Sequence, residues 1–378
     1  MKKLLLILFC LPIIGFGQNV YIPDANFKAY LVGEPLINTN GDSEIQVSEA
    51  SLYSDTINCS NLNISDLTGI EAFTILTYLG CNYNQITSLD VSNNTALTAL
   101  YCDGNQLTNL DVSNNTALTR MHCDGNQLTN LDVSNNTALA RMHCDGNQLT
   151  SLDVSNNTFL TVFNCSNNQL TTLNVSNNIS LTWLYCYNNQ LTSLYVSNCI
   201  LLEGIYSENN QLSNLDLSTN YSLGDLVLNN NLLSSLDISA NTSLQGLFLI
   251  NNQITDLDIS QNSSLYYFEI SNNPFYCLNL ANGNNLNFND CTVQNTPYLY
   301  CIEVDDSSNV TGINTPDSQT YYSNNCNNLC STTEIFEIYQ IKKLLKVTDL
   351  LGRETKQTNK PLLYIYDDGT VEKRLVIE

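Results

Sequence analysis

Residues 100–120 read Leu100-Tyr-Cys-Asp-Gly-Asn-Gln-Leu-Thr-Asn-Leu-Asp-Val-Ser-Asn-Asn-Thr-Ala-Leu-Thr-Arg120, and this 21-residue register continues along most of the chain. Later units begin at Met121, Met142, Phe163, Leu184, Ile205, Leu226, Leu247 and Phe268. A fixed period of this size is the signature of a solenoid, in which each repeat forms one coil and stacks on its neighbours. We therefore expect ten coils over residues 79–288, preceded by a degenerate coil that opens the repeat region 57–288.

Each unit carries two short stretches in which apolar side chains alternate. Leu100 and Cys102 point inward from one predicted strand, and Leu110 and Val112 from a second strand on the opposite wall. Six inward side chains per coil contribute about 9–18 kcal/mol. Because ordering 21 residues costs about 30 kcal/mol, a single coil does not fold alone. Stability is therefore expected to belong to the stacked array.

Two asparagine columns follow the same period. One runs from Asn84 to Asn273, and the other runs from Asn94 to Asn262 with Cys199 in one of its slots. A buried carboxamide can donate and accept hydrogen bonds at once, so it can satisfy turn backbone groups in its own and the adjacent coil. We interpret both columns as structural.

The two halves of a unit nest within each other. The first half reads LxxLxCxxNxL from Leu97 to Leu107, and the second repeats the pattern to Leu118. The chain resembles the nested 21-residue bacterial leucine-rich-repeat class, LxxLxCxxNxLxxLDLxxNxx, over about 230 residues. The resemblance implies a β-rich solenoid rod with two short parallel strands per coil, in a secreted protein of Bacteroidetes type that binds through its surface.

The chain begins like an exported protein. Lys2 and Lys3 precede an apolar run that ends in Gly15-Phe16-Gly17, which is typical of a signal peptide over residues 1–17. No later stretch approaches the roughly 18 apolar residues of a membrane span, so no transmembrane segment is expected.

The formal charge of −23 is unevenly distributed. Residues 18–330 hold 28 acidic residues, and their only basic residues are Lys28, Arg120 and Arg141. Such an acidic body repels nucleic acid and anionic lipid, so neither is an expected partner. It suits cations, cationic partners or simple solubility.

Fourteen cysteines invite a metal or disulfide interpretation. Six of them recur every 21 residues from Cys81 to Cys186, and the same slot later holds Leu228 and Ile270. A slot that accepts Leu and Ile is a core position, so these thiols are expected to be free and buried. Outside this ladder lie Cys277, Cys301, Cys326 and Cys330.

An exported protein favours a disulfide among these four cysteines. The segments 301–306 and 323–326 resemble the closing cap of such repeat proteins, and on that resemblance Cys301–Cys326 is the pair we favour. The partners of Cys277 and Cys330 stay open. We place this C-terminal cap at residues 289–330.

The N-terminal cap, residues 18–56, is expected to open with a helix at Pro23/Asp24. Residues 38–49 then follow the pattern of an EF-hand calcium loop. The predicted ligands are Asn38, Asn40, Asp42, Glu44 through its carbonyl, and Glu49. Asn at the first position and Ser43 in place of Gly depart from the pattern, and a polar capping loop is the alternative. No other cofactor is expected.

The tail, residues 331–378, breaks the period. Alternating strands around an Asp-Gly turn predict a small β-sandwich-like module. Its DLLGR turn (349–353), its Tyr-Ile-Tyr strand (364–366) and its terminal Lys-Arg before an apolar strand resemble the sorting domain of the type IX secretion system of Bacteroidetes. The resemblance implies the type IX machinery as a partner and a destination at the cell surface or in the medium.

The coils differ most at the outward positions of the first strand. We predict a ligand-binding face there for an extracellular protein or glycan, formed by Arg120, His122, Arg141, His143, Trp183, Tyr185, Tyr187, Tyr206 and Phe248. His122 and His143, about 5 Å apart beside Asp124 and Asp145, form a second hypothesis, a transition-metal site that supports metal-dependent enzyme activity. Alternatively, they merely echo a duplicated coil.

No other arrangement in the chain predicts catalysis. We find no Ser-His-Asp set, phosphate loop or convergent carboxylate pair, and an open rod face excludes little water. We therefore expect a protein that is not an enzyme, and the rival to a binding role is a passive spacer. An aspartate column that starts at Asp90 and Asp111 either bonds the following turn amides or recruits cations.

Overall fold

The computed structural model describes residues 17–314, 316–326, 344–348, 361–366 and 371–375. The chain divides into two compact units, residues 1–330 and 331–378. Apart from Gly17, the expected signal peptide lies outside the described residues. So do Cys330, the DLLGR turn and the Asp-Gly turn of the tail.

The N-terminal cap is helical, as predicted. Helix α1 (Ala25–Gly33) begins after Asp24, whose carboxylate accepts hydrogen bonds from the backbone N–H groups of Asn26 and Phe27. Phe27 and Leu31 of this helix are fully buried in the core. A second helix, α2 (Val47–Ala50), follows the loop, and the short 3-10 helix η1 (Ile70–Ala72) lies in the first coil.

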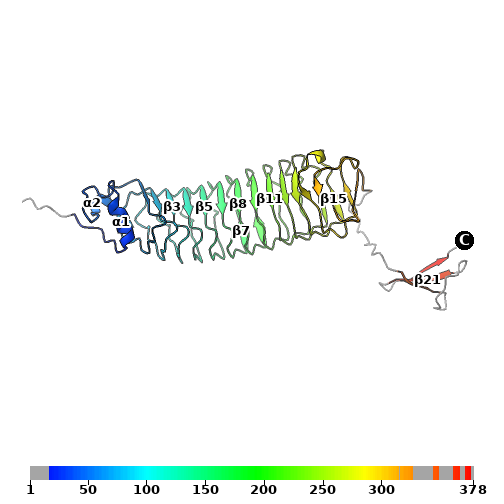
Figure 1. Ribbon diagram of the computed structural model, residues 1–378, viewed down its shortest axis with the longest axis horizontal. Helices are drawn as coiled ribbons and strands as arrows, with labels where there is room; N and C mark the ends of the chain where they lie inside the picture. The colour runs from blue at the N-terminus through cyan, green and yellow to red at the C-terminus, as the bar shows by residue number, and fades with distance from the viewer. Residues whose placement is uncertain (1–16, 315, 327–343, 349–360, 367–370, 376–378) are drawn as a thin grey trace, which may run out of the picture. The chain divides into compact units, whose positions relative to one another are not determined.

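The repeats form a parallel β-solenoid, which confirms the predicted fold (Figure 1). In the main sheet the central residue of each three-residue strand is buried, and most neighbouring strands pair in the 21-residue register, for example Met121 with Met142. The 13-stranded main sheet consists of β1 (Thr56–Asn58), β2 (Tyr78–Gly80), β3 (Ala99–Tyr101), β4 (Arg120–His122), β5 (Arg141–His143), β6 (Val162–Asn164), β8 (Trp183–Tyr185), β10 (Gly204–Tyr206), β11 (Asp225–Val227), β12 (Gly246–Phe248), β14 (Tyr267–Glu269), β16 (Cys291–Thr292) and β18 (Ile313–Asn314).

The opposite wall is less regular. Strands form there as one pair, β7 (Thr172–Asn174) with β9 (Ser193–Tyr195), and as a sheet of β13 (Asp256–Asp258), β15 (Cys277–Asn279), β17 (Cys301–Glu303) and β19 (Tyr321–Ser323). In the other coils the predicted inward residues, such as Leu110 and Val112, are still buried, except that Leu152 is partly buried. The second wall of the solenoid is therefore packed against the core along its length, but its coils pair as hydrogen-bonded β-strands only in part.

The core holds the cysteine ladder as free, buried thiols, which confirms that prediction. The two asparagine columns are buried too, but they bond differently. Asn126 donates from Nδ2 to the carbonyls of Cys102 and Cys123 and accepts from the N–H of Leu107. Asn136, in the other column, donates to two carbonyls, and its Oδ1 has no hydrogen-bond partner among the described residues.

The C-terminal cap is closed by the predicted disulfide. Cys301 on β17 is bonded to Cys326, and their Cα atoms are 5.9 Å apart. Cys277 on β15 is also disulfide-bonded. The short 3-10 helix η2 (Asn285–Asn287) precedes this cap.

The described part of the tail is a three-stranded antiparallel sheet. It consists of β20 (Leu344–Thr348), β21 (Pro361–Tyr366) and β22 (Val371–Leu375), with β21 in the centre. The described tail is thus β-structured, while the sandwich-like arrangement stays a prediction. Within the residues that the structure describes, no helix is both long enough and apolar enough to cross a bilayer.

Candidate functional site

The outward face of the main sheet presents two rows of side chains, because the outer residues of each three-residue strand flank a buried central one. In the row formed by the third residue of each strand, several rings pack against rings of the neighbouring coil. Tyr101 lies 4.5 Å from His122, and Tyr185 lies 5.0 Å from Tyr206, between ring centroids. The strands thus place eight of the nine predicted face residues in these two rows, and Tyr187 lies two residues after the end of β8.

The two histidines meet as predicted. Their imidazole rings stack with centroids 4.3 Å apart and an interplanar angle of 9°. One nitrogen of each ring and one carboxylate oxygen of Asp124 all lie within 4.8 Å of one another. Asp145 is not part of this set, and its Oδ1 accepts a hydrogen bond from Nδ2 of Asn164 at 2.8 Å. Arg120 and Arg141 are exposed beside this group.

Burial sets the charge of the histidine group. Desolvation, followed by the nearby His143 and Arg141, lowers the pKa of His122 to about 4. Desolvation and the charges of Asp145 and Asp103 raise the pKa of Asp124 to about 7. At neutral pH the imidazole of His122 is therefore unprotonated and able to bind a metal, while Asp124 is divided between its acid and its carboxylate.

Further along the sheet lies an aromatic patch, which we define as Trp183, Tyr185 and Tyr206. The indole of Trp183 is 6.4 Å from the ring of Tyr185 and 6.3 Å from that of Tyr206. It leans over strand β10, because Gly204 has no Cβ; a Cβ there would lie 2.4 Å from Cζ3 of Trp183. All three rings are half-buried, so each keeps an exposed part. Phe248 is separate from this patch and contacts Tyr267 edge-on at 5.1 Å.

Asp225 was missed by the sequence reasoning, although it borders the patch. It occupies the strand next to Gly204, and its Oδ1 lies over the backbone of Gly246, 2.8 Å from where a Cβ would be. Desolvation raises the pKa of its carboxyl. Its charge contributes to the raised pKa values of Tyr185 and Tyr206, although burial is the larger cause for both. The two glycines were the available signal, since they replace outward side chains.

An apolar ridge beside the patch was also missed. Its members precede strands β6, β8, β10 and β11 by three or four residues, and between 48% and 63% of each side chain is exposed. They are Phe159, Ile179, Ile200, Leu201 and Tyr221. Most other coils carry Thr, Ala or Ser at these turn positions. The departure from Asn-Asn-Thr-Ala was therefore the signal in the sequence.

The aspartate column on the opposite wall bonds its own turns. Asp111 accepts a hydrogen bond from the N–H of Ser113 at 2.9 Å, and Asp132 does the same with Ser134. Hydrogen bonds from these serines hold the pKa of each aspartate below its ordinary value. Of the two interpretations of this column, the local turn bond is the one that the structure supports.

The predicted calcium ligands lie in one loop, but their oxygens already have partners. Oδ1 of the buried Asn38 accepts a hydrogen bond from the N–H of Gly41, and Oδ1 of Asp42 accepts one from the N–H of Glu44. The carboxylate of Glu49 accepts backbone N–H bonds, including one from Asn40.

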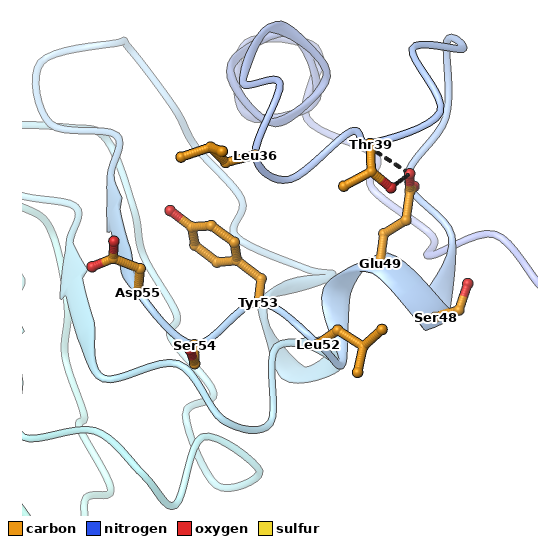
Figure 2. A pocket seen from close by; sticks show the side chains of 8 residues that line it. All are labelled: Leu36, Thr39, Ser48, Glu49, Leu52, Tyr53, Ser54 and Asp55. Atoms are coloured by element: carbon orange, nitrogen blue, oxygen red, sulfur yellow. Dashed lines mark hydrogen bonds between the residues drawn. The ribbon is translucent and has the colours of Figure 1, made fainter.

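Figure 2 shows Thr39 bonded to Glu49 at the edge of a hollow of about 420 Å³. Leu36, Leu52 and Tyr53 also line this hollow, which is partly apolar. A calcium ion would therefore have to displace donors that Glu49 now satisfies, and the site stays a prediction.

Comparison with known proteins shows that the chain is similar to internalins. No family model matches it. The solved functional domain of internalin J (InlJ) from Listeria monocytogenes, described as including a cysteine ladder, is 33% identical with a TM-score of 0.68, and the match covers 81% of this chain and 70% of that domain. The internalin InlF of the same species is 20% identical with a TM-score of 0.58, covering 81% and 98% of the two chains, and supports the fold alone.

Against the full-length sequence of internalin J, the match is confined to a short segment. Internalin J of Listeria monocytogenes serotype 4b (strain F2365) is 41% identical over 78 residues, which are 20% of this chain and 8% of that protein. The chain therefore spans a small part of that protein's length. This chain also has a cysteine ladder, from Cys81 to Cys186, and the internalin J domain is described as including one. This leucine-rich-repeat chain belongs to the internalin family.

Proposed function

We propose that the chain is an exported binding protein that recognises an extracellular partner through the outward face of its main sheet. The observation that carries this proposal is the aromatic patch, three half-exposed rings on two neighbouring strands. Clusters of exposed aromatic rings are uncommon on protein surfaces that have no binding role, and aromatic residues are enriched at interfaces. Membership in the internalin family supports binding without catalysis.

Binding arrays test this proposal. The full chain is applied to arrays of extracellular proteins and glycans, beside the double variant Trp183→Ala with Tyr185→Ala. Tyr195→Ala is the matched control, because Tyr195 is an exposed tyrosine on the opposite wall. We expect the double variant to lose a ligand that the control retains. Equal binding by all three proteins contradicts the assignment of the patch.

The rival role is a passive spacer. It predicts that the arrays find no ligand. It also predicts that, in the cell, deletion of one complete coil has a larger effect than the double variant Trp183→Ala with Tyr185→Ala. The half-exposed patch and the apolar ridge argue against a spacer, since a spacer gains nothing from exposed apolar surface.

Export supports the binding role. The N-terminal signal and the antiparallel sheet of the tail agree with secretion followed by type IX sorting, to the cell surface or the medium. Deletion of residues 331–378 should leave the repeat unit inside the outer membrane of a type IX host, and fractionation of that host measures this. Unchanged export of the shortened chain contradicts the sorting role.

A second candidate function is transition-metal binding by His122, Asp124 and His143. The observation in its favour is the set of two nitrogens and one oxygen within 4.8 Å. Ligands of one Zn²⁺ lie about 2.0–2.2 Å from it, so a modest rotation of these side chains brings them into range. Elemental analysis after exposure to Zn²⁺ or Cu²⁺ should find one ion per chain, lost in His122→Ala. Absence of bound metal dismisses the site and any metal-dependent enzyme activity there.

A further inference from the structure

The border of the aromatic patch is acidic, and nothing in the described chain neutralises it. Asp225 lies on the strand next to the one that Trp183 covers, and Glu203 and Glu208 flank β10. Residues 142–330 contain no Lys or Arg. Among the described residues the single ion pair is Lys28–Glu44, in the N-terminal cap. The negative charge beside the patch therefore has no basic partner within this repeat unit.

One carboxylate oxygen near the patch also lacks a hydrogen bond. Oε2 of Glu208 is buried, and no group in the described residues donates to it. A buried acceptor without a donor costs free energy, so Glu208 leaves the acidic border without internal compensation. Glu208 follows Tyr206 by two residues at the end of β10, which places this residue at the border of the patch.

Aromatic faces and carboxylates together attract one kind of group. The face of an indole or phenol ring is the negative end of its quadrupole, so a Lys or Arg side chain within about 6 Å of the centroid is attracted to it. A carboxylate at the border adds a charge-assisted hydrogen bond to the same cation. Trp183, Tyr206 and Asp225 supply these contacts from three consecutive strands.

The apolar ridge indicates what kind of molecule carries the cation. Ile179, Ile200 and Leu201 precede β8 and β10, the strands of the patch, by three or four residues, so they lie within roughly 10–14 Å of these strands along the chain. Phe159 and Tyr221 lie in the same turn of the coils on either side, before β6 and β11. Protein partners bury such apolar clusters, whereas sugars offer them little. Taking the proposed binding role as its premise, we infer that the patch holds a basic side chain of a protein partner between Trp183, Tyr206 and Asp225, while the ridge packs against apolar residues beside it.

Trp183 makes the inference directly measurable, because it is the only tryptophan of the chain. The probe is a short peptide that alternates Arg with Leu, and its control replaces every Arg by citrulline, which keeps the shape and removes the charge. Titration of the full chain with the Arg peptide should change the fluorescence of Trp183. The citrulline peptide should bind about tenfold more weakly, which corresponds to about 1.4 kcal/mol.

Two carboxylate variants separate local from general attraction. Asp225→Asn should raise the Kd for the Arg peptide several-fold. Asp237→Asn is the matched control and should leave the Kd unchanged, since Asp237 bonds the N–H of Ser239 on the opposite wall. Both variants change the net charge equally. Tyr206→Leu should weaken binding as Asp225→Asn does.

Three results overturn the inference. The first is equal affinity for the Arg and citrulline peptides, and the second is an equal effect of Asp225→Asn and Asp237→Asn. The third is a response of Trp183 to neutral oligosaccharides but not to the Arg peptide, which assigns the patch to a glycan. In each case the proposed binding role still holds if a ligand found on the arrays loses binding in the Trp183→Ala with Tyr185→Ala variant. The binding role itself is contradicted by a different result, in which no ligand on the arrays depends on the patch.

Discussion

The two buried asparagine columns differ in how many of their polar atoms are bonded, so the same substitution should have different costs in each. In the described part of the chain, the N–H of the fully buried Leu107 donates only to Oδ1 of Asn126, and Asn126→Ala removes this acceptor. It also removes one donor from the carbonyls of Cys102 and Cys123, each of which keeps another. An orphaned buried N–H costs about 1–3 kcal/mol and each lost bond about 1 kcal/mol. Asn126→Ala should therefore cost about 3–5 kcal/mol.

Asn136→Ala should cost much less. The carbonyls of Val112 and Asn115 lose one donor each but keep backbone bonds at 2.9 and 3.1 Å. That loss is about 2 kcal/mol, and it is offset by removal of an Oδ1 that is buried without a partner. We expect a net cost of about 0–1 kcal/mol.

The assay is equilibrium unfolding in guanidinium chloride, followed both by circular dichroism and by the fluorescence of Trp183. Asn135→Ala is the surface control, because its side chain is exposed and makes one bond, to Ser113 at 3.2 Å; it should cost less than about 0.5 kcal/mol. The substituted positions lie within one coil of each other, so the array around them is the same. Equal costs for Asn126→Ala and Asn136→Ala, or a reversed order, refute the reasoning from bonded atoms.

Three further predictions concern titration, the cap and calcium. The folded state holds the proton of Asp124 up to a pKa of about 7, whereas the unfolded chain releases it near 3.9, so this stabilisation is complete below about pH 4 and is lost as the pH rises through 7. With EDTA present, Asp124→Asn should therefore be more stable than wild type at pH 8 by about 1–2 kcal/mol, after allowance for solvent screening, and similar at pH 4; a difference that does not change with pH contradicts this. Replacing Cys301 and Cys326 by Ser opens a loop with a sequence separation of 25 residues and should cost about 3.5 kcal/mol in chemical unfolding; an unchanged midpoint counts against a closing role. Calcium at about 1 mM should raise the melting temperature of wild type but not of Asp42→Asn, and no shift in wild type removes the calcium site.

The sequence predicted the solenoid and its core because one repeat constrains every other. The slot of Cys102 is defined by Leu and Ile in later coils, so its burial follows without any coordinates. The pair Cys301–Cys326 was favoured by resemblance and is confirmed. The ladder of the second wall was predicted for every coil, yet it forms only in some, because regular strand pairing depends on small backbone shifts that inward residues alone do not specify.

The site was predicted in outline and completed by the structure. The rows of Trp183, Tyr185 and Tyr206 follow from strand register, which the period sets. The lean of Trp183 across Gly204 does not, because it is a rotamer choice made by the space that a neighbouring coil leaves. The ridge was overlooked for a different reason: in a turn, alternation no longer distinguishes inward from outward side chains.

The stacking of coils in strict register has a consequence for how such a protein varies among individuals. Each coil between the caps contacts only the two beside it, and the coils that begin at Met121 and Met142 are nearly identical in sequence. Unequal recombination between the corresponding gene segments would add or remove 21 residues and lengthen or shorten the stack by one strand spacing, about 4.8 Å, while leaving both caps intact. Alleles that differ in coil number would then carry the same aromatic patch at different distances from the N-terminal cap. The position of the patch along the solenoid would vary while the residues that set its specificity stay the same.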